Sequence, residues 1–129
     1  MTNKSFFLSA ALISFVSCSQ PPSEPVVCTA LYAYGITVTV VDSLSGAPVG
    51  AGATVIATDG AYADTVTHHA GSANDFPFGT AGERAGTYAV TVLKSGYDAW
   101  TRSGITVTRN VCHVNGVAIT AKLRPATGL

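Results

Sequence analysis

Between Ile36 and Leu123, hydrophobic and polar residues alternate with a period of two in several short runs. Such alternation is typical of β-strands, because successive side chains of a strand point to opposite faces of the sheet. Asp59-Gly60 separates two of these runs and is a strong signal for a hairpin turn. The runs that we expect to form strands are 36–41, 53–58, 62–67, 86–94, 99–102, 105–108 and 117–123.

The segment 68–82, HHAGSANDFPFGTAG, has no sustained period and is rich in small and turn-forming residues, so we expect a long loop there. No helical stripe occurs outside the N-terminal segment, and Thr and Val dominate the runs. These features predict an all-β fold, namely a six- to seven-stranded antiparallel β-sandwich, since a sheet with one hydrophobic face must cover it with another layer.

The N-terminal segment has the organisation of a bacterial export signal. Lys4 precedes the mainly hydrophobic run Phe6–Val16, which contains no charge and is too short to span a bilayer comfortably. Phe15–Cys18, FVSC, resembles a lipobox, whose cysteine is lipid-modified and becomes the new N-terminus. Cleavage after Ser19 is the alternative, and it would release a soluble secreted protein. We therefore expect a lipoprotein signal peptide at 1–17 and lipidation of Cys18.

Residues 18–27 are expected to be the lipidated cysteine and a tether, because SQPPSEP at 19–25 is polar and proline-rich and would be stiff and extended. Ser19 follows Cys18 in place of the Asp that commonly retains lipoproteins at the inner membrane. We therefore expect attachment to the outer membrane. Residues 28–124 would form the β-sandwich, and 125–129 a C-terminal tail.

Charge argues against one class of partner. Only 11% of the residues are charged, and removal of 1–17 leaves six Lys and Arg against seven Asp and Glu. Binding to the phosphate backbone needs a basic field, which this composition does not supply. Nucleic acid is therefore not an expected partner, whereas the membrane is one through the lipid anchor.

The chain has three cysteines. If Cys18 carries lipid, Cys28 and Cys112 remain, and export to an oxidising compartment favours a disulfide between them. The bridge would close a loop of 84 residues, for which the chain-entropy model gives about 4 kcal/mol of stabilisation. Cys112 is then expected to form a disulfide, rather than to act as a thiol nucleophile with His113 as its base.

Two stretches carry a family resemblance: ITVTVVDSLSGAPVGAGATVIATDG at 36–60 and AGTYAVTVLKSGYDAW at 85–100. Together they resemble the carboxypeptidase regulatory-like domain, a seven-stranded sandwich of the transthyretin (prealbumin) kind. DGAYADT and CHVNGVAITAKL further resemble a group of bacterial lipoproteins that carry this domain. The resemblance implies a mostly non-catalytic module that stabilises or binds.

Histidines and acidic residues are weak candidates for chemistry. His68, His69 and His113 are three imidazoles, enough for an open zinc site of a small metal-dependent hydrolase if the fold brought them together. The acidic residues lack a DxDxDG-type calcium loop, and we expect them to be exposed solubilising charges: Asp59, Asp64, Asp75 and Glu83.

Aromatic residues are candidates for ligand contact. Phe76, Phe78 and Trp100 could stack against a glycan or a protein partner, although Phe76 and Phe78 could instead close the open end of the sandwich. The C-terminal KLRPATGL lacks the YRGS-type ending of the hydroxyisourate hydrolases, which have the same fold. The sequence thus predicts a non-catalytic, lipid-anchored binding or supporting protein of the cell envelope, without a cofactor.

Overall fold

The computed structural model describes residues 23–128, so the predicted signal peptide at 1–17 and the predicted lipidation site Cys18 lie outside the described residues. The described part contains no helix long and hydrophobic enough to cross a membrane. It consists of eight strands: β1 (Ile36–Asp42), β2 (Thr54–Asp59), β3 (Tyr62–Thr67), β4 (Phe78–Thr80), β5 (Gly86–Leu93), β6 (Trp100–Arg109), β7 (Val114–Asn115) and β8 (Val117–Leu123).

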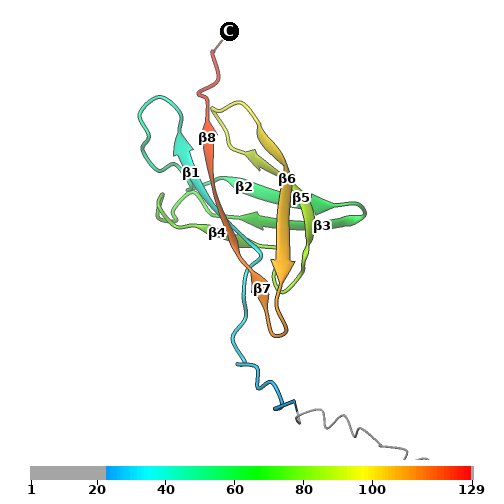
Figure 1. Cartoon of the computed structure of the whole chain (residues 1–129). Coiled ribbons are helices and arrows are strands. Elements are labelled where there is room, and N and C mark those ends of the chain that lie inside the picture. Colours follow the sequence, from blue (N-terminus) through cyan, green and yellow to red (C-terminus); the bar gives the residue numbers. More distant parts are fainter. Residues whose placement is uncertain (1–22, 129) are drawn as a thin grey trace, which may run out of the picture.

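The strands form two sheets that pack face to face (Figure 1), with the orders β4-β1-β8 and β3-β2-β5-β6-β7. The predicted all-β sandwich is thereby confirmed. One pair departs from the expected antiparallel arrangement: β1 and β8 run parallel, from Ile36 opposite Val117 to Asp42 opposite Leu123. Parallel neighbours need a long crossover, and here the five strands of the second sheet lie between β1 and β8 in the chain, together with β4.

The strand count differs from the prediction for two physical reasons. The runs 99–102 and 105–108 belong to one continuous strand, β6, which passes through Gly104 at a φ of 71°. β4 and β7 are only three and two residues long, too short to show a period of two. β4 lies inside the predicted loop 68–82, where it pairs with the first half of β1.

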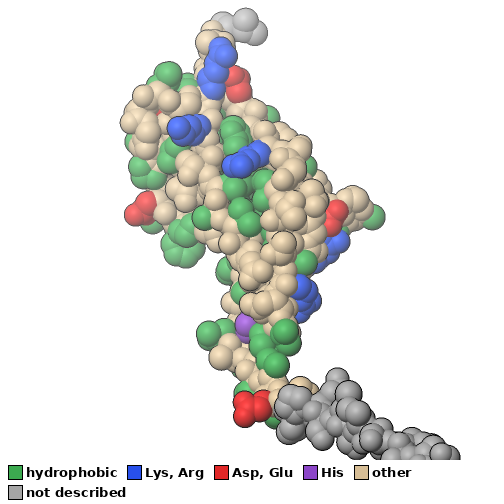
Figure 2. All heavy atoms as spheres, in the orientation of Figure 1, with side chains coloured by type: hydrophobic (Ala, Val, Ile, Leu, Met, Phe, Trp, Pro, Cys, Tyr) green, Lys and Arg blue, Asp and Glu red, His purple; other side chains and the backbone are tan. Residues whose placement is uncertain are grey.

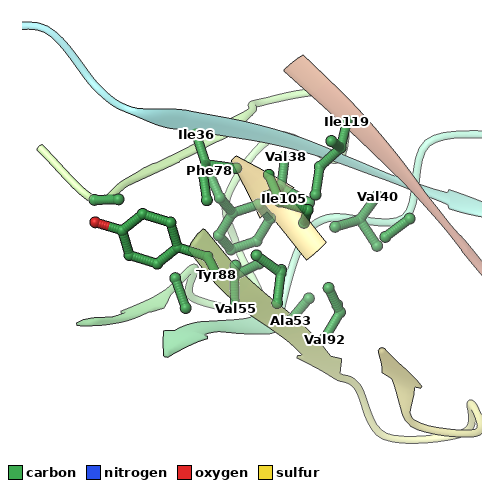
Figure 3. Packing of buried hydrophobic residues seen from close by; sticks show 14 of the residues in the cluster. Ile36, Val38, Val40, Ala53, Val55, Phe78, Tyr88, Val92, Ile105 and Ile119 are labelled. Atoms are coloured by element: carbon green, nitrogen blue, oxygen red, sulfur yellow. The ribbon is translucent and has the colours of Figure 1, made fainter. Parts of the chain in front are cut away.

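The core lies between the sheets and explains the alternation. Ile36, Val38 and Phe78 of the smaller sheet point toward Val55, Tyr88 and Val92 of the larger one (Figure 3), and all are at most 1% exposed. Full burial of one such side chain contributes roughly 1.5–3 kcal/mol relative to exposure. The hydrophobic positions of the strands therefore hold the two layers together.

A single carboxylate joins the edges of the two sheets where β3 meets β4. Asp64 Oδ2 on β3 accepts hydrogen bonds from Thr80 Oγ1 at 2.7 Å and from the Ala81 N–H at 3.0 Å. Thr80 and Ala81 are fully buried, so both donors depend on this oxygen. Asp64 is thus a structural residue, which corrects the expectation of an exposed solubilising charge.

Candidate functional site

An open groove of about 410 Å³ lies next to the junction of β3 and β4. Its lining comes from the segment before β1, from β1 itself, from the end of β3 and from the chain around β4, and comprises Tyr34, Thr37, Val66, His68, Phe76, Pro77 and Gly79. None of these side chains is an acid, a lysine or an arginine. We call this feature the aromatic groove, since three of its residues carry aromatic rings.

Two of the rings are open to solvent. Phe76 is 62% exposed and Tyr34 is 52% exposed, although large hydrophobic side chains are usually buried. Hydrophobic side chains reach the surface beside the loop that leads into β4, on the face shown in Figure 2. Exposed rings around a concave, uncharged surface are typical of a binding site.

The absence of a side chain at Gly79 leaves room for the Tyr34 ring. A Cβ atom on Gly79 would lie only 2.6 Å from Cδ2 of Tyr34, so the ring occupies the space that a side chain of β4 would fill. Tyr32 lies against Gly82 in the same way, and the two tyrosine rings meet edge to face with centroids 5.3 Å apart. These contacts position Tyr34 at the groove without burying it.

His68 forms an inner wall of the groove. Its ring stacks on the buried Phe78, with centroids 3.7 Å apart and planes at 13°, and it faces Phe76 at 5.4 Å and 52°. Burial, together with the neighbouring His69, lowers the pKa of His68, so the imidazole is neutral at pH 7. Its Nδ1 atom is buried and has no hydrogen-bond partner within the described part of the chain.

The structure separates the three aromatic candidates. Phe76 lies in the groove. Phe78 is fully buried and packs in the core, where it stacks on the His68 ring rather than contacting a ligand. Trp100 is half-buried on β6, where it lies opposite Val92, and it does not line the groove. Trp100 is therefore not part of the aromatic groove, and a ligand contact of Trp100 would lie on another surface of the protein.

A second cluster lies where the N-terminal segment joins the sandwich. The predicted disulfide between Cys28 and Cys112 is present, with Cα atoms 5.3 Å apart. It ties the segment before β1 to the loop between β6 and β7, and Asn110 Oδ1 organises that loop by accepting the N–H groups of Cys112 and His113, each at 2.8 Å. Cys112 is therefore no free nucleophile.

Next to the disulfide, a hydroxyl, an imidazole and a carboxylate lie in series. Thr29 Oγ1 is 3.1 Å from His113 Nε2, and His113 Nδ1 is 2.8 Å from Glu83 Oε1. Glu83 Oε1 also accepts the Ala33 N–H at 2.8 Å, and this bond, followed by the one with His113, lowers the pKa of Glu83. Glu83 is thus held in place by two partners, which corrects the expectation of a solubilising charge.

The order of these groups resembles that of a nucleophilic triad. A triad also needs N–H donors for an oxyanion and a cavity for the substrate. The N–H groups of Cys112 and His113 already donate to Asn110, and none of the three side chains lines the aromatic groove. We interpret the series as a clamp on the N-terminal segment, and we call it, with the disulfide, the N-terminal clamp.

The histidines predicted as weak metal ligands are not brought together. His68 lies in the aromatic groove, whereas His113 belongs to the N-terminal clamp, and His69 is exposed. Residues 23–128 contain no group of three or more His, Cys, Asp or Glu side chains that could hold a metal ion. Asp59, another predicted solubilising charge, pairs with Arg84 at 2.7 Å, whereas Asp75 is exposed as expected.

Tyr34 and Thr37 are groove residues that were not predicted from the sequence. Tyr32 and Tyr34 are two tyrosines at alternating positions directly before a strand, which is a recognisable but weak signal for an exposed aromatic pair. The decisive contact, with Gly79, lies 45 positions away in the chain, inside what the sequence predicts to be a loop.

The resemblance to the carboxypeptidase regulatory-like domain rests on the motifs at 36–60 and 85–100, and it stays a prediction. No family model matches the chain, and a search of the curated proteins finds no match either.

Proposed function

We propose that the protein is a non-catalytic, lipid-anchored protein of the bacterial envelope that binds a partner protein in the aromatic groove. The observation that carries the proposal is the pair of exposed rings, Tyr34 and Phe76, on a concave surface without charged side chains. Aromatic residues are enriched at protein interfaces because they bury a large area at a small cost in conformational entropy.

A protein partner fits the groove better than a glycan does. Flat stacking on sugars favours exposed rings that share a plane, whereas Tyr32 and Tyr34 are at 85° and His68 and Phe76 at 52°. Asp, Asn and Arg side chains can hydrogen-bond to sugar hydroxyls, and the lining contains none of these three residue types.

The disulfide supports an exported location, because such bonds persist in oxidising compartments. The described start of the tether leaves the sandwich at the end opposite the C-terminus (Figure 1), which suits a domain that projects away from its attachment point. The lipid on Cys18 and the outer membrane as its site belong to the proposal. Cys18→Ala should move the protein from the detergent phase to the aqueous phase, and unchanged partitioning would contradict the anchor.

Site-specific photo-crosslinking in cells tests the binding role. A photoreactive phenylalanine at position 76 should give a discrete crosslinked protein, and Tyr34→Ser in the same chain should remove it. Leu44, in the turn after β1, is the matched control, because it is 83% exposed and lies outside the groove. Equal crosslinking from positions 76 and 44 would contradict the proposed function.

A further inference from the structure

We infer that the aromatic groove recognises a proline-rich segment of its partner in the extended polyproline II conformation. This inference rests on the proposed function and narrows it from a protein partner to one kind of peptide. It follows from three properties of the groove: the arrangement of its rings, the hydrogen-bonding character of its polar groups and its lack of charge.

Aromatic rings line the groove at two places. Tyr34 is held over Gly79, and Phe76 stands at the other end of the short segment 76–79, next to His68. Pro77 and Val66 complete the hydrophobic lining. Grooves lined by aromatic side chains are known to bind proline-rich peptides. The polyproline II helix is already extended before it binds, so the peptide loses little conformational entropy.

The polar side chains of the groove can all act as donors. They are the hydroxyls of Tyr34 and Thr37, for which the structure shows no hydrogen bond within the described residues, and the imidazole of His68. In proteins, a buried N–H group without a hydrogen-bond partner is rarer than a buried acceptor without one. Because Nδ1 of His68 is buried and has no described partner, we expect the neutral ring to carry its hydrogen on Nε2. Proline has a carbonyl acceptor but no N–H, so a donor-lined groove complements it.

The absence of charge from the lining argues against other peptide classes. Recognition of phosphorylated or acidic segments uses arginine clusters, and a basic segment would need carboxylates. The lining itself contains no carboxylate, and Oδ2 of Asp64 on β3 already accepts hydrogen bonds from Thr80 and Ala81. An uncharged segment therefore loses the least solvation on entering the groove.

NMR titration of the exported, disulfide-bonded chain with octaproline tests the inference. Saturable shifts should appear at Tyr34, His68 and Phe76, and a Gly-Ser peptide of the same length should cause none. Tyr34→Ala should weaken binding by about tenfold or more, since central aromatic residues dominate such contacts. Tyr34→Phe, which keeps the ring and removes the hydroxyl, should weaken it less.

The control variant Leu44→Ala should bind octaproline as the unmodified chain does. Absence of saturable shifts, or shifts away from the groove, would overturn the inference. Shifts of the same residues by an uncharged linear glucose oligomer, without a response to octaproline, would overturn it in favour of a glycan. If position 76 still crosslinks a protein in cells while octaproline does not bind, the peptide class is wrong and the proposed function stands.

Discussion

The N-terminal clamp and the aromatic groove use their side chains in opposite ways. In the clamp, the sulfur atoms of Cys28 and Cys112 are bonded to each other, and the imidazole of His113 has partners on both nitrogens. In the groove, Tyr34 and Phe76 remain exposed, and the hydroxyls of Tyr34 and Thr37 have no hydrogen-bond partner within the described residues. The clamp is complete within the chain, whereas the groove has contacts left to make.

This contrast separates stability from function. Groups that are already paired inside the protein contribute to its folding, and they gain little from a ligand. Exposed rings and unpaired polar atoms lower the stability slightly, and they are retained at sites where a partner satisfies them. Changes in the clamp should therefore alter the free energy of unfolding, and changes in the groove should mainly alter binding.

Removal of the disulfide should have the largest effect. The variant Cys28→Ala/Cys112→Ala opens a loop of 84 residues, and its free energy of unfolding should fall by about 4 kcal/mol. Chemical denaturation of the variant and of the oxidised chain measures the difference. The groove should still bind its ligand in the folded variant, and a loss of binding at full folding would show that the two regions are coupled.

Asp64→Ala should give the next largest effect, because it removes the acceptor for two buried donors. One unsatisfied buried donor costs about 1–3 kcal/mol, so the free energy of unfolding should fall by at least that amount. Asp64→Asn keeps a carbonyl oxygen and should be milder. Asp75→Ala, at an exposed position, is the control, and an equal loss for Asp75→Ala would refute the role of Asp64 as the tie between the sheets.

The groove and the clamp should respond to pH in different ranges. The folded pKa of His68 lies below its usual value of 6.5, so on acidification the unfolded chain takes up the proton first. The free energy of unfolding should therefore decrease as the pH falls from about 6.5 through the lower folded pKa. His68→Phe should remove this part of the pH dependence, whereas His69→Phe should only reduce it, because burial is the larger cause of the lowered pKa. An unchanged profile in His68→Phe would contradict burial of a neutral imidazole.

Glu83 reports on the clamp at lower pH. Its folded pKa lies below the usual 4.5, so its contribution to stability is present above about 4.5 and is lost as the pH falls through the lower folded pKa. Glu83→Gln should flatten the acid limb of the stability profile. The effect should be smaller than that of Asp64→Ala, because the Glu83 side chain is 30% exposed. Urea unfolding at stepped pH separates the two limbs.

The sequence predicts the scaffold well and the sites in part. The runs 62–67 and 117–123 coincide with β3 and β8, because a strand buried on one face shows its period directly. The disulfide follows from the cysteine count and export. Asp64 with Thr80, and Glu83 with His113, could not be predicted, because the two residues of each pair are 16 and 30 positions apart and meet only once the fold has formed. β4 was missed because its strand character comes from pairing with β1, not from a local pattern.

Gly79→Ala should have the smallest effect on stability and still change the groove. The new methyl group would lie within 2.8 Å of three Tyr34 ring atoms, so this exposed ring must move away from β4. The movement should cost less than about 1 kcal/mol of unfolding free energy, since an exposed side chain can turn into solvent. Binding of octaproline should weaken severalfold, because the wall formed by Tyr34 is displaced. Gly71→Ala, where the added methyl group has no atom within 4 Å, should change neither quantity. If Gly79→Ala left binding unchanged, the Tyr34 ring would not be needed for binding. If Gly79→Ala caused a large loss of stability, Tyr34 would support the fold rather than the groove.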